Sequence, residues 1–188
     1  MNNREKISTV RDGPGFKGQI PQLRITRIFD ASREALFKAW TDREQLKQWW
    51  GPKDFSWVSC QLELYAGGLC HYCMRSPEGI DMWGRFLYLE IRPPARIIFI
   101  NSFSDEEGYP VKHPLMPDWP LEILNTVSFT EAGGKTALQM YVIPHTATIP
   151  ECKNFAAGLE SVRQGFASTW NQLENFLSRN IMQDHFRD

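Results

Sequence analysis

The chain has 188 residues, a formal net charge of −1 at pH 7 and seven tryptophans. This length fits one domain, and the balanced charge carries no electrostatic signature of a nucleic-acid partner or of an anionic membrane surface. Neither a signal peptide nor a run approaching the roughly 20 apolar residues of a membrane helix is visible, so we expect a cytoplasmic protein without membrane insertion.

One ordered domain with two terminal segments is predicted. Residues 1–19 include the Gly- and Pro-rich stretch RDGPGFKG and show no hydrophobic period, which favours a flexible lead-in. The domain itself is expected at 20–180. Residues 181–188 are expected to form a C-terminal tail.

The first elements are a strand and two short helices. Residues 22–29 (QLRITRIF) alternate apolar and polar side chains, which predicts a strand with an imperfect polar face. Residues 30–40 and 41–50 then show helical spacing, each behind a short polar residue that favours a helix start. The cap candidates are Asp30 or Ser32 for the first helix and Thr41 or Asp42 for the second.

From residue 55 the hydrophobic period changes to two, which is typical of β-strands. Alternation places Val58, Cys60 and Leu62 on one face and Trp57 on the other. A polar, Pro-rich loop is expected at 104–120. The predicted strands of this antiparallel series are 55–64, 69–76, 81–91, 96–103, 121–130 and 136–143.

The chain then has a break at 144–151 and its only long helical pattern. Apolar residues recur there at i, i+3, i+4 and i+7 spacings, as expected for a helix that packs one face on a sheet. The sequence therefore predicts an α+β domain, in which an antiparallel sheet of about seven strands wraps around a long C-terminal helix. The apolar stripe consists of Leu159, Val162, Phe166, Trp170, Leu173 and Leu177.

The sequence lacks most motifs that indicate a metal site, a bound cofactor or a catalytic nucleophile. Cys70 and Cys73 have C-x-x-C spacing, but residues three apart on a strand point to opposite faces, so we expect neither a shared metal nor a disulfide. The scattered histidines and the lack of a phosphate-binding glycine motif give no support for a cofactor. Catalytic residues stay unassigned. Glu63, Asp81 and Glu90 are acid–base candidates if buried, although strand carboxylates more often face solvent.

Asn125 is the polar residue that departs from this pattern. It shares its predicted strand face with Ile123, Val127 and Phe129, which alternation assigns to the interior. A buried amide needs hydrogen-bond partners. Asn125 therefore faces either a cavity or a neighbouring loop, and the sequence leaves both open.

Two adjacent tryptophans precede a Gly-Pro turn in the stretch KQWWGPKDF. Pro52 lacks a backbone donor and Gly51 tolerates unusual dihedral angles, so the chain is expected to turn sharply after Trp49 and Trp50. Indoles at such a corner either close one end of a core, the more common case, or form the rim of a ligand pocket.

The sequence resembles the START-like (SRPBCC, helix-grip) superfamily, and within it bacterial proteins similar to the C-terminal domain of the activator of the heat-shock-protein-ninety ATPase. The resemblance covers roughly residues 23–177. It departs from the family pattern at Glu63 and Tyr65, where Asp-x-Arg is usual, and at Phe166, where Trp often follows the glycine. The segments that carry it, in the family's order, are RIFDASREALFKAWTDREQLKQWWGP, LELYAGG, GRFLYLEIRPPARIIFINSFSDEEG, WPLEILNTVSF, GGKTAL and RQGFASTWNQLENFL.

This resemblance implies a cavity between the sheet and the last helix, which members of the superfamily use for lipids, polyketides and other apolar molecules. A small apolar ligand is therefore the expected partner. The cavity candidates are Trp49, Trp50, Phe55, Tyr72, Met74, Trp83, Asn125, Phe166 and Trp170.

Two other function classes stay open. A polyketide-cyclase-like or hydrolase-like enzyme would use a cavity carboxylate such as Glu63 or Glu90, and a raised carboxyl pKa would favour it. A chaperone-interacting protein, by analogy with the ATPase activator, would present a large exposed apolar patch. A homodimer is also left open. Fold analogy alone does not decide among them.

Overall fold

The structure, a computed structural model, describes residues 20–185 of the chain, and the side chains of residues 20–179. Eight strands and three helices make up this part. The strands are β1 (Leu23–Phe29), β2 (Ser56–Leu62), β3 (Leu69–Arg75), β4 (Asp81–Arg92), β5 (Arg96–Ser104), β6 (Pro110–Val111), β7 (Glu122–Ala132) and β8 (Lys135–His145). The helices are α1 (Arg33–Thr41), α2 (Arg43–Leu46) and α3 (Ile149–His185).

All strands join one antiparallel sheet, in the order β1-β8-β7-β5-β4-β3-β2, with β6 paired to β5 beside this path. The predicted α+β fold with two short helices after the first strand is thereby confirmed. One difference is β6, a two-residue strand inside the segment predicted as a loop. It continues the hydrogen bonding of β5 beyond the last residue that β7 pairs.

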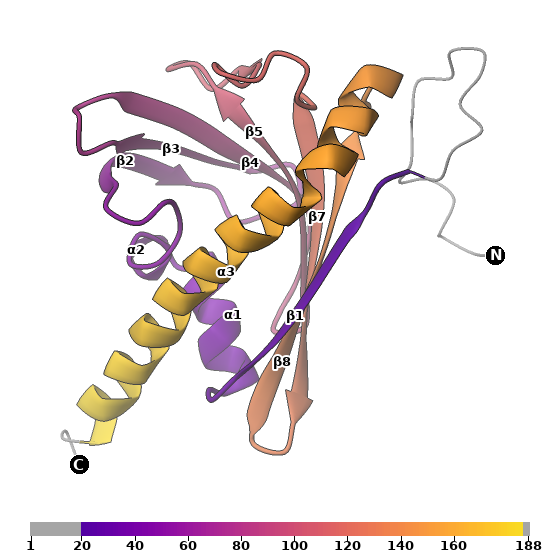
Figure 1. Cartoon of the computed structure of the whole chain (residues 1–188). Helices are drawn as coiled ribbons and strands as arrows, with labels where there is room; N and C mark the ends of the chain where they lie inside the picture. The colour runs from indigo at the N-terminus through magenta and orange to yellow at the C-terminus, as the bar shows by residue number, and fades with distance from the viewer. Residues whose placement is uncertain (1–19, 186–188) are drawn as a thin grey trace.

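Helix α3 crosses one face of the sheet obliquely, and the strands curve around it (Figure 1). Its predicted apolar stripe faces the sheet, with Trp170 and Leu173 fully buried in the main core. A polar link ties the helix to β1, because Arg27 donates to Asn171 Oδ1 at 2.7 Å and pairs with Glu174. These contacts join α3 to the first strand in addition to its apolar packing.

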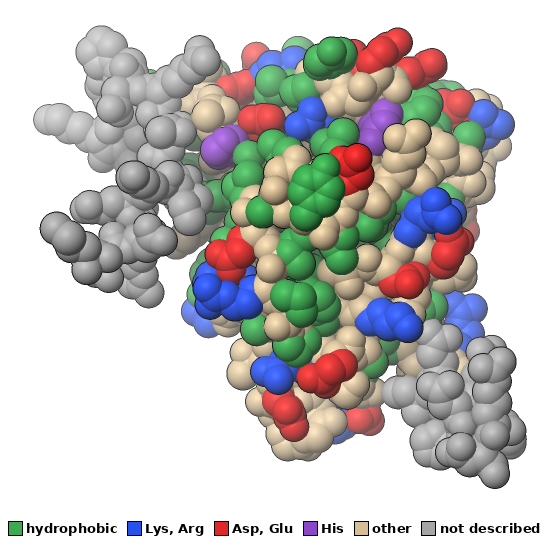
Figure 2. Space-filling model, turned by 180° about the vertical axis from the view of Figure 1, so that it is seen from behind, with side chains coloured by type: hydrophobic (Ala, Val, Ile, Leu, Met, Phe, Trp, Pro, Cys, Tyr) green, Lys and Arg blue, Asp and Glu red, His purple; other side chains and the backbone are tan. Residues whose placement is uncertain are grey.

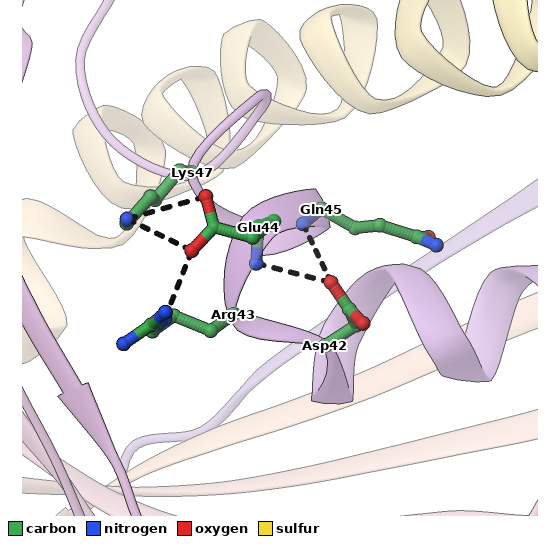
Figure 3. A network of polar contacts seen from close by, with 5 residues as sticks. All are labelled: Asp42, Arg43, Glu44, Gln45 and Lys47. Carbon is green, nitrogen blue, oxygen red and sulfur yellow. Dashed lines mark hydrogen bonds and ion pairs between the residues drawn. The ribbon is translucent and has the colours of Figure 1, made fainter.

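Helix caps fix the short helices that lead to the tryptophan pair. Ser32 Oγ accepts from the backbone N–H of Ala35, and Asp42 caps α2 by accepting from two backbone N–H groups at 3.0 Å each (Figure 3). Glu44 joins Arg43 and Lys47 in an exposed ion-pair network on the same turn. Each helix thus starts at one of its two predicted cap candidates.

The predicted alternation in β2 is wrong at its start. A register shift lies between Trp57 and Ser59, so an extra residue is inserted there. Val58, predicted on the same face as Cys60, is 48% exposed, whereas Trp57 packs against the core with its ring centroid 5.2 Å from that of Tyr72. A bulge reverses the side-chain faces of the residues before it, which strict alternation does not anticipate.

Helix α3 begins earlier than its hydrophobic pattern indicates. Thr148 and Glu151 form a capping box, in which a Glu151 carboxylate oxygen accepts from the Thr148 backbone N–H at 2.6 Å and from its hydroxyl at 2.8 Å. At its other end the helix continues to His185, into the predicted tail. The predicted lead-in, 1–19, lies outside the described residues, and the domain limits stay a prediction.

A smaller apolar cluster lies on the sheet face opposite α3. Ile98, Ile100 and Leu124 form it, with Leu87 and Ile143 beside them. Seen from this side, hydrophobic side chains are interspersed with charged ones of both signs (Figure 2). Among residues 20–185, no helix combines the length and the apolar composition needed to cross a bilayer.

Candidate functional site

The Gly-Pro turn after the tryptophan pair has the sharp geometry that its sequence predicts. Gly51 has a φ of 111°, a conformation that glycine adopts without strain, and a side chain there would meet the Met74 sulfur. Gln172 of α3 donates from Nε2 to the Gly51 carbonyl at 2.9 Å. The turn is therefore held between β3 and α3.

Trp49 belongs to the core. Its side chain is 1% exposed, and its ring centroid lies 4.8 Å from that of Trp40 on α1. The indole N–H donates to the Ala39 carbonyl at 2.9 Å. That carbonyl lies in the last turn of α1, where carbonyls have no partner within the helix. Trp49 thus closes one end of the core and caps a helix end.

Trp50 has a different environment from its neighbour. It is half-buried, contacts Phe86 edge-to-face with centroids 4.9 Å apart, and lies 6.4 Å from the Phe166 ring. Its indole N–H donates to the Tyr72 hydroxyl at 3.4 Å. The two adjacent indoles therefore have different environments: Trp49 lies inside the core, and Trp50 lies at its edge.

A cleft of about 440 Å³ lies between α3 and the sheet, partly open to solvent. Its lining is mainly apolar, Lys53 is its one charged residue, and no carboxylate belongs to it among the described residues. This combination is typical of a small-molecule site. The lining residues are Trp50, Gly51, Pro52, Lys53, Tyr72, Met74, Met82, Asn101, Val162, Gly165, Phe166, Ser168 and Thr169.

Four of the nine predicted cavity residues line this cleft together: Trp50, Tyr72, Met74 and Phe166. Phe55 and Trp83 line a second hollow of about 400 Å³, near the turn between β3 and β4. The Trp83 ring stacks on His71 at 4.9 Å, with an interplanar angle of 23°. These two residues therefore face a different space from Tyr72.

Asn125 is buried, at 1% exposed, and makes two hydrogen bonds. Its amide nitrogen donates to Asn101 Oδ1 at 2.8 Å and to the Ile123 carbonyl at 3.0 Å. Asn101, on β5, lines the cleft and has no counterpart among the residues predicted from the sequence. The sequence pattern was sufficient to predict Asn101 at this site, because it alternates with Ile97 and Phe99 on the interior face of its strand.

The C-x-x-C cysteines lie on opposite sides of the sheet, as strand geometry predicts. Cys70 is in the main core, while Cys73 is buried on the other face, opposite Trp83 in the β3–β4 register. A hydrogen bond with the Cys60 thiol, together with burial, raises the pKa of the Cys70 thiol far above its usual range. Within the described part of the chain, no cluster of three metal-binding side chains occurs.

The carboxylate candidates for acid–base chemistry lie outside the cleft lining. Glu63 is exposed and accepts from the Tyr65 hydroxyl at 3.2 Å. Glu90 forms a two-point pair with Arg96, at 2.8 and 2.9 Å. Asp81 forms a similar pair with Arg75, which lowers the pKa of its carboxyl. All three carboxylates therefore have polar partners outside the cleft.

Trp170 is 1% exposed, and its indole N–H has no hydrogen-bond partner among the described residues. We expect Trp170→Phe to lower the free energy of unfolding by no more than about 1 kcal/mol, because removal of the unpaired N–H offsets part of the lost ring contacts. Urea unfolding measures the difference. A loss of about 3 kcal/mol, as large as that of truncating a buried aromatic to alanine, would contradict it.

Comparisons with known proteins agree with this architecture. Protein Ms6760 from Mycobacterium smegmatis shares 26% sequence identity with the chain at a TM-score of 0.67, with 83% of this chain and 90% of that one covered. A Staphylococcus epidermidis protein has 26% identity and a TM-score of 0.66, covering 87% and 93%. An Arthrobacter aurescens protein, at 23% identity, TM-score 0.69 and coverage of 84% and 86%, supports the fold alone.

No curated protein matches the chain. The family model described as "Activator of Hsp90 ATPase homolog 1-like protein" matches residues 30–178, which is most of the domain. The helix-grip resemblance seen in the sequence is thereby confirmed, with the long helix across an antiparallel sheet as its structural counterpart. The chain belongs to the family of Activator of Hsp90 ATPase homolog 1-like proteins.

Proposed function

We propose that the protein binds a small apolar or aromatic molecule in the cleft between the sheet and α3. The observation that carries this proposal is a cleft of about 440 Å³ whose walls include Trp50, Met74 and Phe166. Burial of apolar ligand surface against them contributes about 25 cal/mol per Å². The aromatic walls favour flat ligands, since offset and edge-to-face contacts add to area burial.

The composition of the cleft favours binding over acid–base catalysis. Its described lining contains no carboxylate, and Glu63 and Glu90 are engaged elsewhere on the surface. The apolar cluster opposite α3 consists of three buried residues, and on that face hydrophobic side chains are interspersed with charged ones (Figure 2), which gives little support to a chaperone surface. A chaperone partner, a homodimer and a cytoplasmic location stay predictions from the sequence.

The direct test uses N-phenyl-1-naphthylamine, an uncharged dye that fluoresces when it leaves water. The protein is titrated into a fixed, low dye concentration. We expect saturable binding at one site, with a Kd of about 0.2 mM or tighter, as roughly −0.3 kcal/mol per non-hydrogen atom gives for a molecule of this size. Absence of any saturable signal, in a protein shown to be folded by circular dichroism, would contradict the proposal.

A further inference from the structure

Two donors on the sheet side of the cleft, neither of them exposed, have no acceptor among the described residues. The first is the Tyr72 hydroxyl, which accepts from the Trp50 indole N–H but donates to none of the described residues. Desolvation raises the pKa of this phenol well above its usual range. The hydroxyl therefore stays protonated and available as a donor at any physiological pH.

Gly84 is the reason why this hydroxyl reaches the middle of the sheet. Tyr72 on β3 pairs with Gly84 on β4, and its ring lies across the space that a side chain at 84 would occupy. A Cβ there would stand 2.6 Å from the Tyr72 hydroxyl oxygen. The ring is held from both sides, by Trp57 at 5.2 Å and Phe86 at 5.5 Å. The phenol thus extends over β4 toward β5.

The second donor comes from β5. Asn101 is opposite Phe86 in the β4–β5 register, and its amide oxygen accepts from Asn125 at 2.8 Å. In this arrangement the Asn101 NH₂ group lies in the lining of the cleft without an acceptor among the described residues, and the Asn125 amide oxygen is unpaired as well. Tyr72 and Asn101 therefore present donors from the two sides of β4 to one space.

An unpaired donor in a partly desolvated site favours a ligand that supplies the acceptor. Among the described residues neither donor has an acceptor within hydrogen-bond distance, the lining contains no carboxylate, and its charged residue, Lys53, is itself a donor. We propose that the ligand of this cleft carries a carbonyl-type oxygen, which accepts from the Tyr72 hydroxyl and the Asn101 amide while its apolar body contacts Trp50 and Phe166. This assignment rests on the proposed binding function.

The test compares two ligands of nearly equal shape, 2-acetylnaphthalene and 2-ethylnaphthalene, which differ by a carbonyl oxygen. Both are measured by displacement of N-phenyl-1-naphthylamine from the wild type and from Tyr72→Phe, which keeps the ring. We expect the substitution to weaken the ketone about 2- to 10-fold, the range of one neutral hydrogen bond. The hydrocarbon should change less than about twofold, because it makes no such bond.

Asn101→Asp provides a second variant. The carboxylate still accepts from Asn125, but it replaces the free donor by an acceptor, so the ketone should lose more affinity than in Tyr72→Phe. Equal ketone-to-hydrocarbon ratios in all three proteins would overturn the carbonyl assignment and leave apolar binding intact. Failure of both ligands and of the dye to bind the wild type would overturn both proposals.

Discussion

Trp49→Ala is expected to lower the free energy of unfolding by about 3–5 kcal/mol, the range for truncation of a large aromatic in a packed interior. The indole is 1% exposed and touches Trp40 at a centroid distance of 4.8 Å. Its loss also leaves the Ala39 carbonyl without the donor at 2.9 Å. An unmade buried hydrogen bond adds to the cost, which places Trp49→Ala toward the upper end of the range.

Trp50→Ala is the matched control at the next residue. Trp50 is half-buried and has the open cleft on one side, so it has fewer contacts to lose, and we expect a loss of no more than about 2 kcal/mol. Trp50→Ala should weaken dye binding more than Trp49→Ala does. Urea unfolding and dye titration of both variants measure this contrast. Equal stability losses, or dye binding reduced only by Trp49→Ala, would contradict the division of roles.

The elements that follow from local patterns were predictable. The caps at Ser32 and Asp42 are short polar residues before helical spacing, and the α3 stripe follows from 3.6-residue periodicity. The bulge at Trp57 was not predictable, because it depends on how β2 pairs with β3. The capping box from Thr148 to Glu151 can be recognised in the sequence, but it lies upstream of the apolar stripe, so the stripe alone places the helix start too late.

The candidate site was only partly predictable, for a related reason. Counting bulky aromatics puts Tyr72 and Trp83 in one cavity, although they occupy opposite faces. The two become distinguishable once Tyr72 is known to pair with Gly84, so that Trp83 opposes Cys73. The space that Gly84 leaves for the phenol is likewise a relation between two strands. Single-chain periodicity contains no information on such register.

Gly165→Trp is expected to weaken dye binding at least 10-fold without loss of stability. Gly165 lies on α3 in the lining of the cleft, and a Cβ built there meets nothing within 4 Å. We therefore expect an indole at this position to occupy part of the space that the ligand needs. Its helical backbone also becomes more favourable, because glycine inside a helix costs about 1 kcal/mol relative to alanine and tryptophan costs less.

Gly165→Ala separates occupation of the cleft from the change in helix propensity. It gives the helix up to about 1 kcal/mol of added stability but adds a single methyl group to the cleft, so dye affinity should stay within about twofold of the wild type. Gly165→Trp should weaken the dye at least 10-fold, which corresponds to about 1.4 kcal/mol. Titration of both variants, with urea unfolding alongside, decides the matter. Wild-type affinity in a stably folded Gly165→Trp protein would place the bound dye outside the cleft and remove the basis for the proposed function.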